Sequence, residues 1–288
     1  MRRKKTRSMA RRARCGVFAL ASVIALSGFM FLESALAPKA ELWPRWQAHD
    51  SQSQARIEHG VWDRFLGTYL RSGKDGINRV LYGRITDADK KALHGYLNRL
   101  RNIPIGRFNR AEQKAYWINL YNALTVRLVI EFFPVESIKD IDVSQRVFGG
   151  PFDRKLLEIG GEPISLNDIE HRILRPIWRD PRIHYAVNCA SLGCPNLIAR
   201  AYTGANSETL LESAARAYVN HPRGTRVEDG RLVASKIYAW FQEDFGGSEE
   251  DVIRHLRRYA APPLVKALEG RDGIDEFEYD WRLNGANE

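Results

Sequence analysis

The spacing of hydrophobic and polar residues changes period along this chain, which indicates helices and strands in mixed order. The longest apolar segment, AEQKAYWINLYNALTVRLVIEFF, follows Asn109 and stops before Pro134. Asn109 and Glu112 resemble a capping box, and proline cannot continue a helix. The segment holds too many apolar residues for a surface helix, so we expect it to be a central buried helix.

Shorter patterns surround this segment. A Gly160-Gly161 turn and an Asp229-Gly230 turn predict two hairpins. The run IHYAVN at 183–188 predicts a strand, and the alternation of aromatic and charged residues over 277–283 predicts a half-buried final strand. Helices are expected at about 52–69, 86–101, 165–178, 207–219, 237–245 and 249–259. Hairpins mixed with helices favour a single α+β domain with a small antiparallel sheet.

Composition is that of a globular protein, since 44% of the 288 residues are hydrophobic and 27% are charged. The net charge of +9 first suggests a nucleic-acid partner. Eight basic residues, however, lie before position 15 with no acidic residue among them, and removing them leaves +1. The rest of the chain is nearly neutral, so we expect no nucleic-acid partner.

The basic residues precede an uncharged stretch, CGVFALASVIALSGFMFL, and then small residues, which is the order of a secretory signal. The stretch is 18 residues long and just reaches membrane-spanning length. Pro38 follows the best cleavage site, Ala35-Leu36-Ala37, so a cleaved signal and a retained anchor both stay open. We divide the chain into a targeting segment (1–37), a linker that docks (38–50) and a globular domain (51–288).

Two cysteines remain beyond the targeting segment, Cys189 and Cys194, and an exported domain meets an oxidising compartment. They lie in a small, polar loop that directly follows the predicted strand. Four interpretations stay open: a disulfide, structural or redox-active; a catalytic thiol; two inert buried thiols; and a metal site with a histidine. The last lacks a second ligand pair, and we expect no metal and no cofactor.

A catalytic thiol requires a base and a group that orients the base. For Cys189 as nucleophile, the candidate bases are His184 and His171, and the candidate orienters or oxyanion donors are Asn122 and Asn188. In a regular strand His184 and Asn188 share a face, and Cys189 points away from them. His171 on the preceding helix is therefore as plausible a partner as His184.

Other polar residues belong to the same candidate site. Asn119 and Asn122 share one face of the buried helix, although asparagine is a poor residue for a helix interior. They either bond loop backbone in the core or line a polar pocket together with Ser191. Glu170 and His171 are adjacent on their helix and do not bond each other directly; a structural role for that histidine is the simpler interpretation.

Five ordered segments resemble the domain of unknown function 547 family: WINLYNALTVRLVIEFFP, ISLNDIEHRILR, IHYAVNCASLGCPNL, SKIYAWFQEDFG and EYDWRLN. The resemblance covers about 110–284. It implies a bacterial envelope protein and no established activity. The order of helix, hairpin and His-bearing strand is also similar to transglutaminase-like and papain-type cores, although the usual helix-borne cysteine is missing. The family's signature positions correspond to Asn119, Asn122, Glu170, His171, His184, Asn188, Cys189, Ser191, Cys194 and Pro195.

The leading functional hypothesis is thiol-dependent acyl transfer or hydrolysis at Cys189. The rivals are a non-enzymatic scaffold with a structural Cys189–Cys194 bridge, and a thiol–disulfide redox protein. We expect the domain in the bacterial periplasm, held at the inner membrane by the N-terminal segment or released after cleavage.

Overall fold

The structure is a computed structural model that describes residues 37–141 and 150–286. The predicted targeting segment, apart from residue 37, lies outside these ranges. Within them, no helix has the length and apolar character that crossing a membrane requires.

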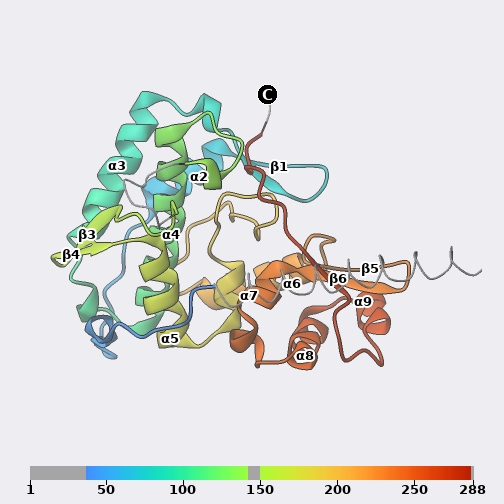
Figure 1. The fold of residues 1–288 in the computed structure, drawn as a ribbon. Helices are drawn as coiled ribbons and strands as arrows, with labels where there is room; N and C mark the ends of the chain where they lie inside the picture. The colour runs from blue at the N-terminus through green and yellow to red at the C-terminus, as the bar shows by residue number, and fades with distance from the viewer. Residues whose placement is uncertain (1–36, 142–149, 287–288) are drawn as a thin grey trace, which may run out of the picture.

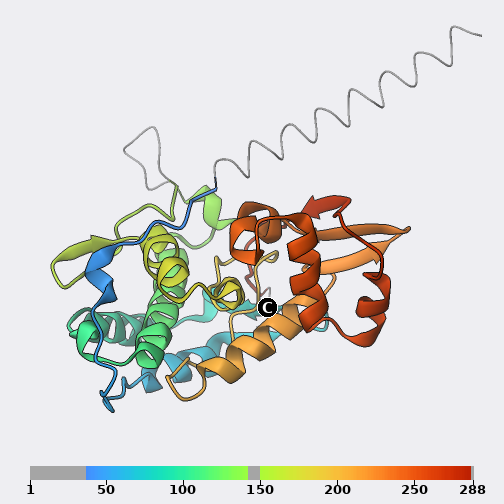
Figure 2. The same ribbon diagram turned by 90° about the horizontal axis from the view of Figure 1, so that it is seen from below.

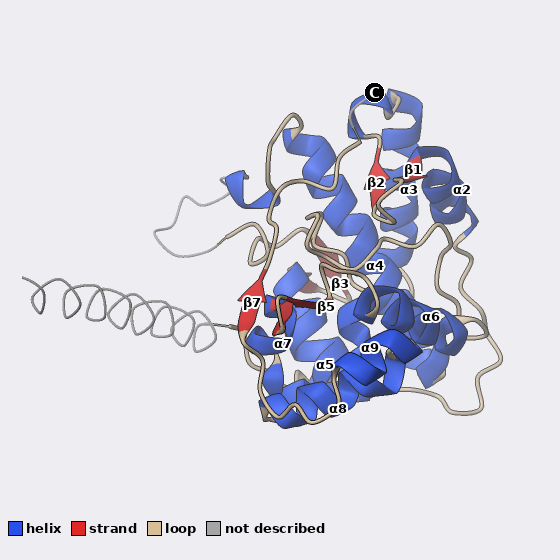
Figure 3. Ribbon diagram, turned by 90° about the vertical axis from the view of Figure 1, so that its right-hand side faces the viewer, coloured by secondary structure: helices blue, strands red, loops and turns tan. Residues whose placement is uncertain are grey.

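The protein is a mixed α+β fold (Figure 1). The strands are short beside the helices (Figure 3). In chain order the elements are α2 (Gly60–Tyr69), β1 (Leu70–Ser72), β2 (Asn78–Val80), α3 (Asp87–Arg101), α4 (Arg110–Phe132), β3 (Leu157–Ile159), β4 (Glu162–Ile164), a π-helical segment η5 (Asp168–Leu174), α5 (Arg175–Trp178), a 3-10 helix η6 (Pro181–Tyr185), α6 (Ser207–Val219), β5 (Thr225–Glu228), β6 (Arg231–Ser235), α7 (Lys236–Trp240), a 3-10 helix η7 (Gln242–Phe245), α8 (Glu249–Tyr259), α9 (Pro262–Ala267) and β7 (Glu276–Glu278).

Helix α4 is the central buried helix that the apolar pattern predicts. Every side chain from 112 to 129 is buried, and the helix packs against α3, α6 and η5. Asn109 caps it by accepting a hydrogen bond from the Glu112 N–H at 3.0 Å. The Glu112 carboxylate does not complete the capping box. It accepts the backbone N–H groups of Ile57 and Gly204 instead, and so ties two loops to the start of α4.

Buried side chains form two apolar clusters. The larger one surrounds α3 and α4, and the smaller one lies among α6, β6 and α8. Figure 2 shows the helices of the two clusters on opposite sides of the molecule. The segment with η6 and the cysteine loop contributes to both clusters, since Ile183 and Ala190 pack in the larger one and Tyr185 packs in the smaller one. The candidate site therefore lies where the clusters meet.

Three small sheets replace the single antiparallel sheet that the sequence suggests. Both predicted hairpins are confirmed, as β3–β4 and β5–β6. Strand β7 pairs with β6 in parallel, with Val233 opposite Glu276, so a purely antiparallel arrangement is wrong. The helices between β6 and β7 carry the chain back to the start of β6, and a parallel pair needs such a crossover.

The predicted strand at 183–188 is also wrong, because residues 181–185 form the 3-10 helix η6. Asp180 accepts the N–H of Arg182, and Pro181 occupies the first helical position, which suits its fixed φ. Two helix boundaries differ as well. The first helix begins only at Gly60, and the helix expected at 237–245 is divided into α7 and η7. Without a strand, the argument that His184 and Cys189 point to opposite faces no longer applies.

The C-terminal segment joins distant parts of the fold. After β7 its backbone pairs with the cysteine loop, where the Gly193 N–H donates to the Asp280 carbonyl at 2.8 Å. It then reaches β2, where the Val80 N–H donates to the Asn284 carbonyl at 2.9 Å. In Figure 1 this red segment runs from the β6 region to the neighbourhood of β1. The last residues thus hold the cysteine loop against the first half of the chain.

Asn119 shows why α4 tolerates asparagine in its interior. Its amide donates to the Tyr202 carbonyl at 2.7 Å and accepts the Tyr202 N–H at 3.0 Å. The side chain is fully buried, so both backbone groups of Tyr202 depend on it. Of the two interpretations that the sequence left open, this residue bonds loop backbone.

We expect Asn119→Ala to lower the free energy of unfolding by about 2–4 kcal/mol, because two buried backbone groups lose their partner. Urea unfolding followed by circular dichroism measures this change. Asn98→Ala is the matched control, since Asn98 is an exposed residue of helix α3. Equal effects of the two substitutions would contradict a structural role for Asn119.

Candidate functional site

The cysteine loop places two sulfur atoms side by side. Cys189 Sγ lies 2.9 Å from Cys194 Sγ, 3.2 Å from Ser191 Oγ and 3.0 Å from the Tyr279 hydroxyl. A disulfide bond is about 2.05 Å long, and both cysteines are free thiols in the structure. The predicted Cys189–Cys194 bridge is therefore not formed here, and its formation under oxidising conditions stays a prediction.

The two thiols differ in exposure and in acidity. Cys189 is partly exposed, whereas Cys194 is buried. Burial raises the pKa of the Cys189 thiol, but hydrogen bonds from Cys194, Ser191 and Tyr279 outweigh it and lower this pKa below its ordinary value. Burial and the neighbouring Cys189 hold the pKa of the Cys194 thiol well above its ordinary value. Cys189 is thus the thiol that ionises first.

Asn122 fixes where the loop begins. From within α4 its amide donates to the Ala186 carbonyl at 2.9 Å and accepts the Asn188 N–H at 2.8 Å. Because both ends of the amide are bonded to backbone, Asn122 positions the cysteines. Neither Asn119 nor Asn122 lines the pocket that contains the two thiols.

Asn188 holds the loop closed on itself. Its amide donates to the Pro195 carbonyl at 2.7 Å and accepts the Ala190 N–H at 2.9 Å, which bridges the two ends of the loop. Asn284 of the C-terminal segment donates to the same Asn188 oxygen at 3.2 Å. Asn188, like Asn122, is a positioning residue in this geometry.

Gly193 is required by a close approach of two backbones. A Cβ atom at this position would lie 2.7 Å from the backbone nitrogen of Asp280. The glycine lets the C-terminal segment run directly along the loop, and this contact delivers the Tyr279 hydroxyl to both Cys189 and Ser191.

A buried group of charges lies beside the thiols. His184 Nε2 is 2.6 Å from Asp244 Oδ2, and His184 Nδ1 is 3.5 Å from Glu170 Oε1. Arg175 Nε donates to the same Asp244 oxygen at 2.5 Å. Burial alone lowers the pKa of His184, but the hydrogen bonds that it donates to Asp244 and Glu170 raise it above its ordinary value. Both ring nitrogens face carboxylates, an arrangement that favours the imidazolium form.

The carboxylates and the second histidine complete this group. Burial opposes ionisation of Glu170 and Asp244, yet their cationic neighbours lower both pKa values to about 2. Burial lowers the pKa of His171 to about 4, so it is neutral. Its Nδ1 lies 2.9 Å from an Arg175 nitrogen, which always donates, so the His171 proton belongs on Nε2.

Neither histidine has the geometry of a base for Cys189. Among the described residues, the hydrogen-bond partners of the Cys189 sulfur are Cys194, Ser191 and Tyr279. Both histidines nevertheless line the same pocket as the thiols. The structure thus brings the predicted residues together, but not as a thiol–imidazole pair. In the described ranges, no group of three ligand-type side chains forms a metal site.

The pocket has a volume of about 320 Å³. Cys189, Cys194, Glu170, His171 and His184 form its polar part. Its remaining walls are mostly apolar and aromatic, from Tyr121, Phe152, Val187, Ile237, Trp240, Phe241, Tyr279 and Trp281.

Tyr279, Asp244 and Arg175 also belong to the site, although the sequence patterns gave them no role there. Tyr279 was assigned to a half-buried strand by its alternation with other aromatic residues, and Asp244 ends a segment assigned only to packing. Their contacts with the site span from 60 to 90 residues along the chain. A pattern of neighbouring residues cannot predict contacts between residues that are so far apart along the chain.

The segment after the predicted targeting region also reaches the pocket. Pro38 lines it, and the Pro38 carbonyl accepts an Arg175 N–H at 2.7 Å. The N–H groups of Glu41 and Trp43 donate to the carbonyls of His171 and Arg172, both at 2.9 Å. Proline at position 176 has no N–H, so one carbonyl a turn earlier lacks its helical donor. Residues 38–43 thus pack along η5 beside the site.

The chain carries a domain of the family described as "Protein of unknown function, DUF547", at residues 105–219. The resemblance seen in the sequence is therefore confirmed over these residues, whereas its last two segments, SKIYAWFQEDFG and EYDWRLN, lie beyond the match. The matched region contains α4, η5, η6, the cysteine loop and α6, whereas Asp244 and Tyr279 lie beyond it. Comparisons with curated proteins and with solved structures give no match.

We expect the raised pKa of His184 to make stability depend on pH. Folding favours the protonated form, so the contribution is complete below about pH 6.5 and is lost as pH rises through the raised pKa. Asp244→Asn removes the 2.6 Å partner and lowers the pKa of His184. NMR titration of the histidine side chains measures the shift.

Asp87→Asn is the matched control for this titration, because Asp87 is an exposed carboxylate at the start of α3. It should leave the pKa of His184 unchanged. A native His184 that titrates at or below about pH 6.5 would show that the two carboxylates do not stabilise an imidazolium.

Proposed function

We propose that Cys189 and Cys194 form a thiol–disulfide exchange pair, in which Cys189 attacks and Cys194 resolves. The observation that carries this proposal is the pairing of two free thiols 2.9 Å apart with unequal exposure and opposite pKa shifts. An attacking thiol must be accessible and ionised, and a resolving thiol must be close to it. Cys189 is the more exposed and the more acidic of the two thiols, and Cys194 lies 2.9 Å from it.

The reaction needs a disulfide as co-reactant. The Cys189 thiolate attacks one sulfur of the substrate disulfide, the substrate S–S bond breaks, and one substrate thiolate leaves with the electron pair. Cys194 then gives up its proton and attacks the Cys189 sulfur, which releases the second substrate thiolate. The protein dithiol is oxidised to a disulfide, and the substrate is reduced to two thiols.

The geometry favours exchange over acyl transfer. A thiol acyltransferase needs a base at the sulfur and hydrogen-bond donors for an oxyanion. The Cys189 N–H donates to Cys194 Sγ at 2.9 Å, and the amides of Asn122 and Asn188 are bonded to backbone. The resemblance to a transglutaminase or papain core rested on a strand that carries His184. In the structure His184 lies in the 3-10 helix η6, so this support is lost.

The pocket favours disulfides next to apolar or aromatic groups. Its walls near Cys189 include Trp240, Tyr279 and Trp281, whose ring centroids lie 4.7–5.6 Å apart. Oxidised glutathione carries no aromatic group, so it gains nothing from these walls. A substrate with an aromatic or bulky apolar neighbour to its sulfur suits these walls.

The place of action follows from the N-terminal segment. Its basic residues, apolar stretch and small residues support export to the bacterial cell envelope, with the membrane as a partner if the segment is retained. Disulfides persist in such a compartment, so substrates for exchange are present there.

Trapping separates the roles of the two cysteines. Incubated with a disulfide peptide, Cys194→Ser should retain a mixed disulfide at Cys189, because the resolving thiol is missing. Cys189→Ser should form none, and the unsubstituted protein should release it. Mass spectrometry of the intact protein and of its peptides measures the adduct.

Equilibration in dithiol buffers then distinguishes exchange from a structural bridge. We expect a reduction potential above about −300 mV, whereas structural disulfides generally lie below this value. A lower potential, or adducts that form equally at both cysteines, would overturn the exchange proposal. A Cys189 acyl adduct formed from a thioester would favour acyl transfer instead.

Substrate preference tests the aromatic walls. Reduced protein should react faster with 4,4′-dithiodipyridine than with oxidised glutathione, and Trp240→Ala should slow the first reaction about five- to tenfold through loss of one aromatic contact. Thiopyridone release measures the rate. Trp178→Ala is the control, since Trp178 is a partly buried tryptophan that does not line the pocket. Equal losses in both variants would contradict the preference.

A further inference from the structure

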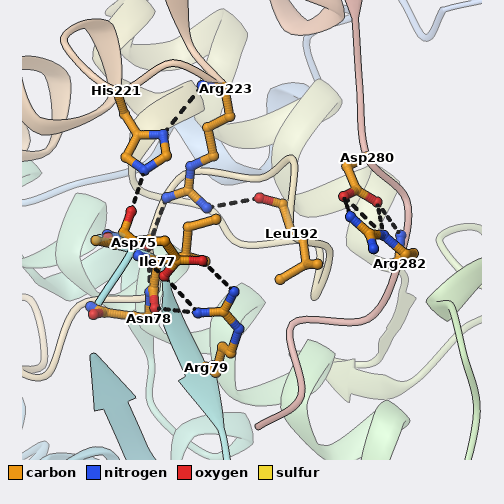
Figure 4. A network of polar contacts seen from close by, with 11 residues as sticks. Asp75, Ile77, Asn78, Arg79, Leu192, His221, Arg223, Asp280 and Arg282 are labelled. Carbon is orange, nitrogen blue, oxygen red and sulfur yellow. Dashed lines mark hydrogen bonds and ion pairs between the residues drawn. The ribbon is translucent and has the colours of Figure 1, made fainter. Parts of the chain in front are cut away.

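Arg223 is bonded to the cysteine loop and does not line the pocket. Its Nη1 donates to the Leu192 carbonyl at 2.8 Å and its Nη2 to Asn196 Oδ1 at 2.6 Å (Figure 4). Leu192 and Asn196 stand two residues before and two residues after Cys194. One guanidinium therefore holds the loop on both sides of the buried thiol.

The charge of Arg223 has no carboxylate partner among the described residues. Its Nε atom is buried without a hydrogen bond, and the nearby Asp75 carboxylate is bonded to Arg79 (Figure 4). Arg226, three residues later, shows the ordinary arrangement, with Glu228 at 3.0 Å and Glu278 at 2.8 Å. A desolvated and unpaired cation is costly unless an anion forms close to it.

Apart from the Asp75 carboxylate, the groups near Arg223 that can become anions are thiols and phenols. Its guanidinium lies 5.6 Å from the Tyr218 ring, and the Tyr218 hydroxyl donates to the carbonyl of Gly193, the neighbour of Cys194. Burial lowers the pKa of Arg223, while Tyr218, Cys194, Tyr279 and Asp75 act to raise it. The cation therefore couples electrically to the resolving thiol.

We propose that Arg223 is a positioning residue that stabilises the Cys194 thiolate during the resolving step. The inference rests on the exchange function proposed above. While Cys189 is a thiolate, its negative charge opposes ionisation of Cys194. In the mixed disulfide that sulfur is neutral, and the positive charge of Arg223 then acts on Cys194 without competition. On the pocket side, His184 is enclosed by two carboxylates and the Lys139 ammonium stands over the Trp281 ring, 4.8 Å from its centroid, whereas Arg223 is bonded to the loop on both sides of Cys194.

A two-phase reaction tests this inference on the full chain. Cys15→Ser leaves Cys189 and Cys194 as the only thiols, since the sequence has three cysteines. With 5,5′-dithiobis(2-nitrobenzoic acid), attack by Cys189 releases one thionitrobenzoate, and resolution by Cys194 releases the second. In this background, Arg223→Gln should leave the first phase within about twofold, slow the second about tenfold and raise the pH midpoint of the second by about one unit.

Two variants serve as controls. Arg223→Lys keeps the charge and should retain the pH midpoint, although it makes fewer hydrogen bonds. Arg226→Gln removes an ion-paired arginine nearby and should change neither phase. A loss of rate in Arg223→Gln with an unchanged midpoint would mean that Arg223 only holds the loop, and this would overturn the inference.

The same experiment separates failure of the inference from failure of the proposed function. If unsubstituted protein shows no second phase, the exchange function is wrong and the inference falls with it. If both phases occur and Arg223→Gln alters neither, the inference alone is overturned. Should Arg223→Gln not fold, the midpoint in Arg223→Lys decides, because a midpoint shifted upward despite the retained charge contradicts the electrostatic role.

Discussion

The contact on which the site depends is the one between the Asn122 amide and the backbone on either side of Val187. A single side chain in the middle of a buried helix satisfies the Ala186 carbonyl and the Asn188 N–H. Neither group belongs to a strand or a regular helix, so each would otherwise be buried without a partner. Because α4 is rigid and enclosed, the position of this amide sets where the cysteine loop begins. Asn188 and Gly193 then determine how it closes and what runs beside it.

The pocket contains two separate polar groups: a set of paired charges, and the two thiols with their uncharged hydrogen-bond partners. His184, Glu170, Asp244 and Arg175 satisfy one another, so the imidazolium is held in place by its carboxylates. The thiols are stabilised mainly by uncharged donors. A site of this kind suits a sulfur that reacts with another sulfur, since disulfide exchange requires a thiolate and a leaving thiolate but no oxyanion hole. The DUF547 region supplies the cysteines and both histidines, while later residues supply Asp244, Tyr279 and Arg223.

The features that sequence patterns predicted are those decided within a few residues. The cap of α4 at Asn109, its buried length and the two glycine hairpins all follow from local chemistry. The membership of the site was also largely predicted, because Cys189, Cys194, His171, His184 and Glu170 line one pocket. Their roles were not predictable. A strand was predicted over 183–188 because of its β-branched and aromatic residues. Asp180 and Pro181 instead start a 3-10 helix there. Tyr279 and Arg175 join the site through contacts across long stretches of chain, which no periodicity encodes.

The contribution of the C-terminal segment has a consequence for the order in which the protein is made. A ribosome completes both cysteines about ninety residues before Tyr279, as the 90-residue separation of the Cys189–Tyr279 contact shows. Until then the loop lacks the backbone of Asp280 and the amide of Asn284, so the nascent thiols have neither their native hydrogen bonds nor their native shielding. The contribution of Tyr279 to the acidity of Cys189 is therefore a property of the finished chain. A chain that ends early would carry its cysteines without this hydrogen bond, open to whatever oxidant it meets.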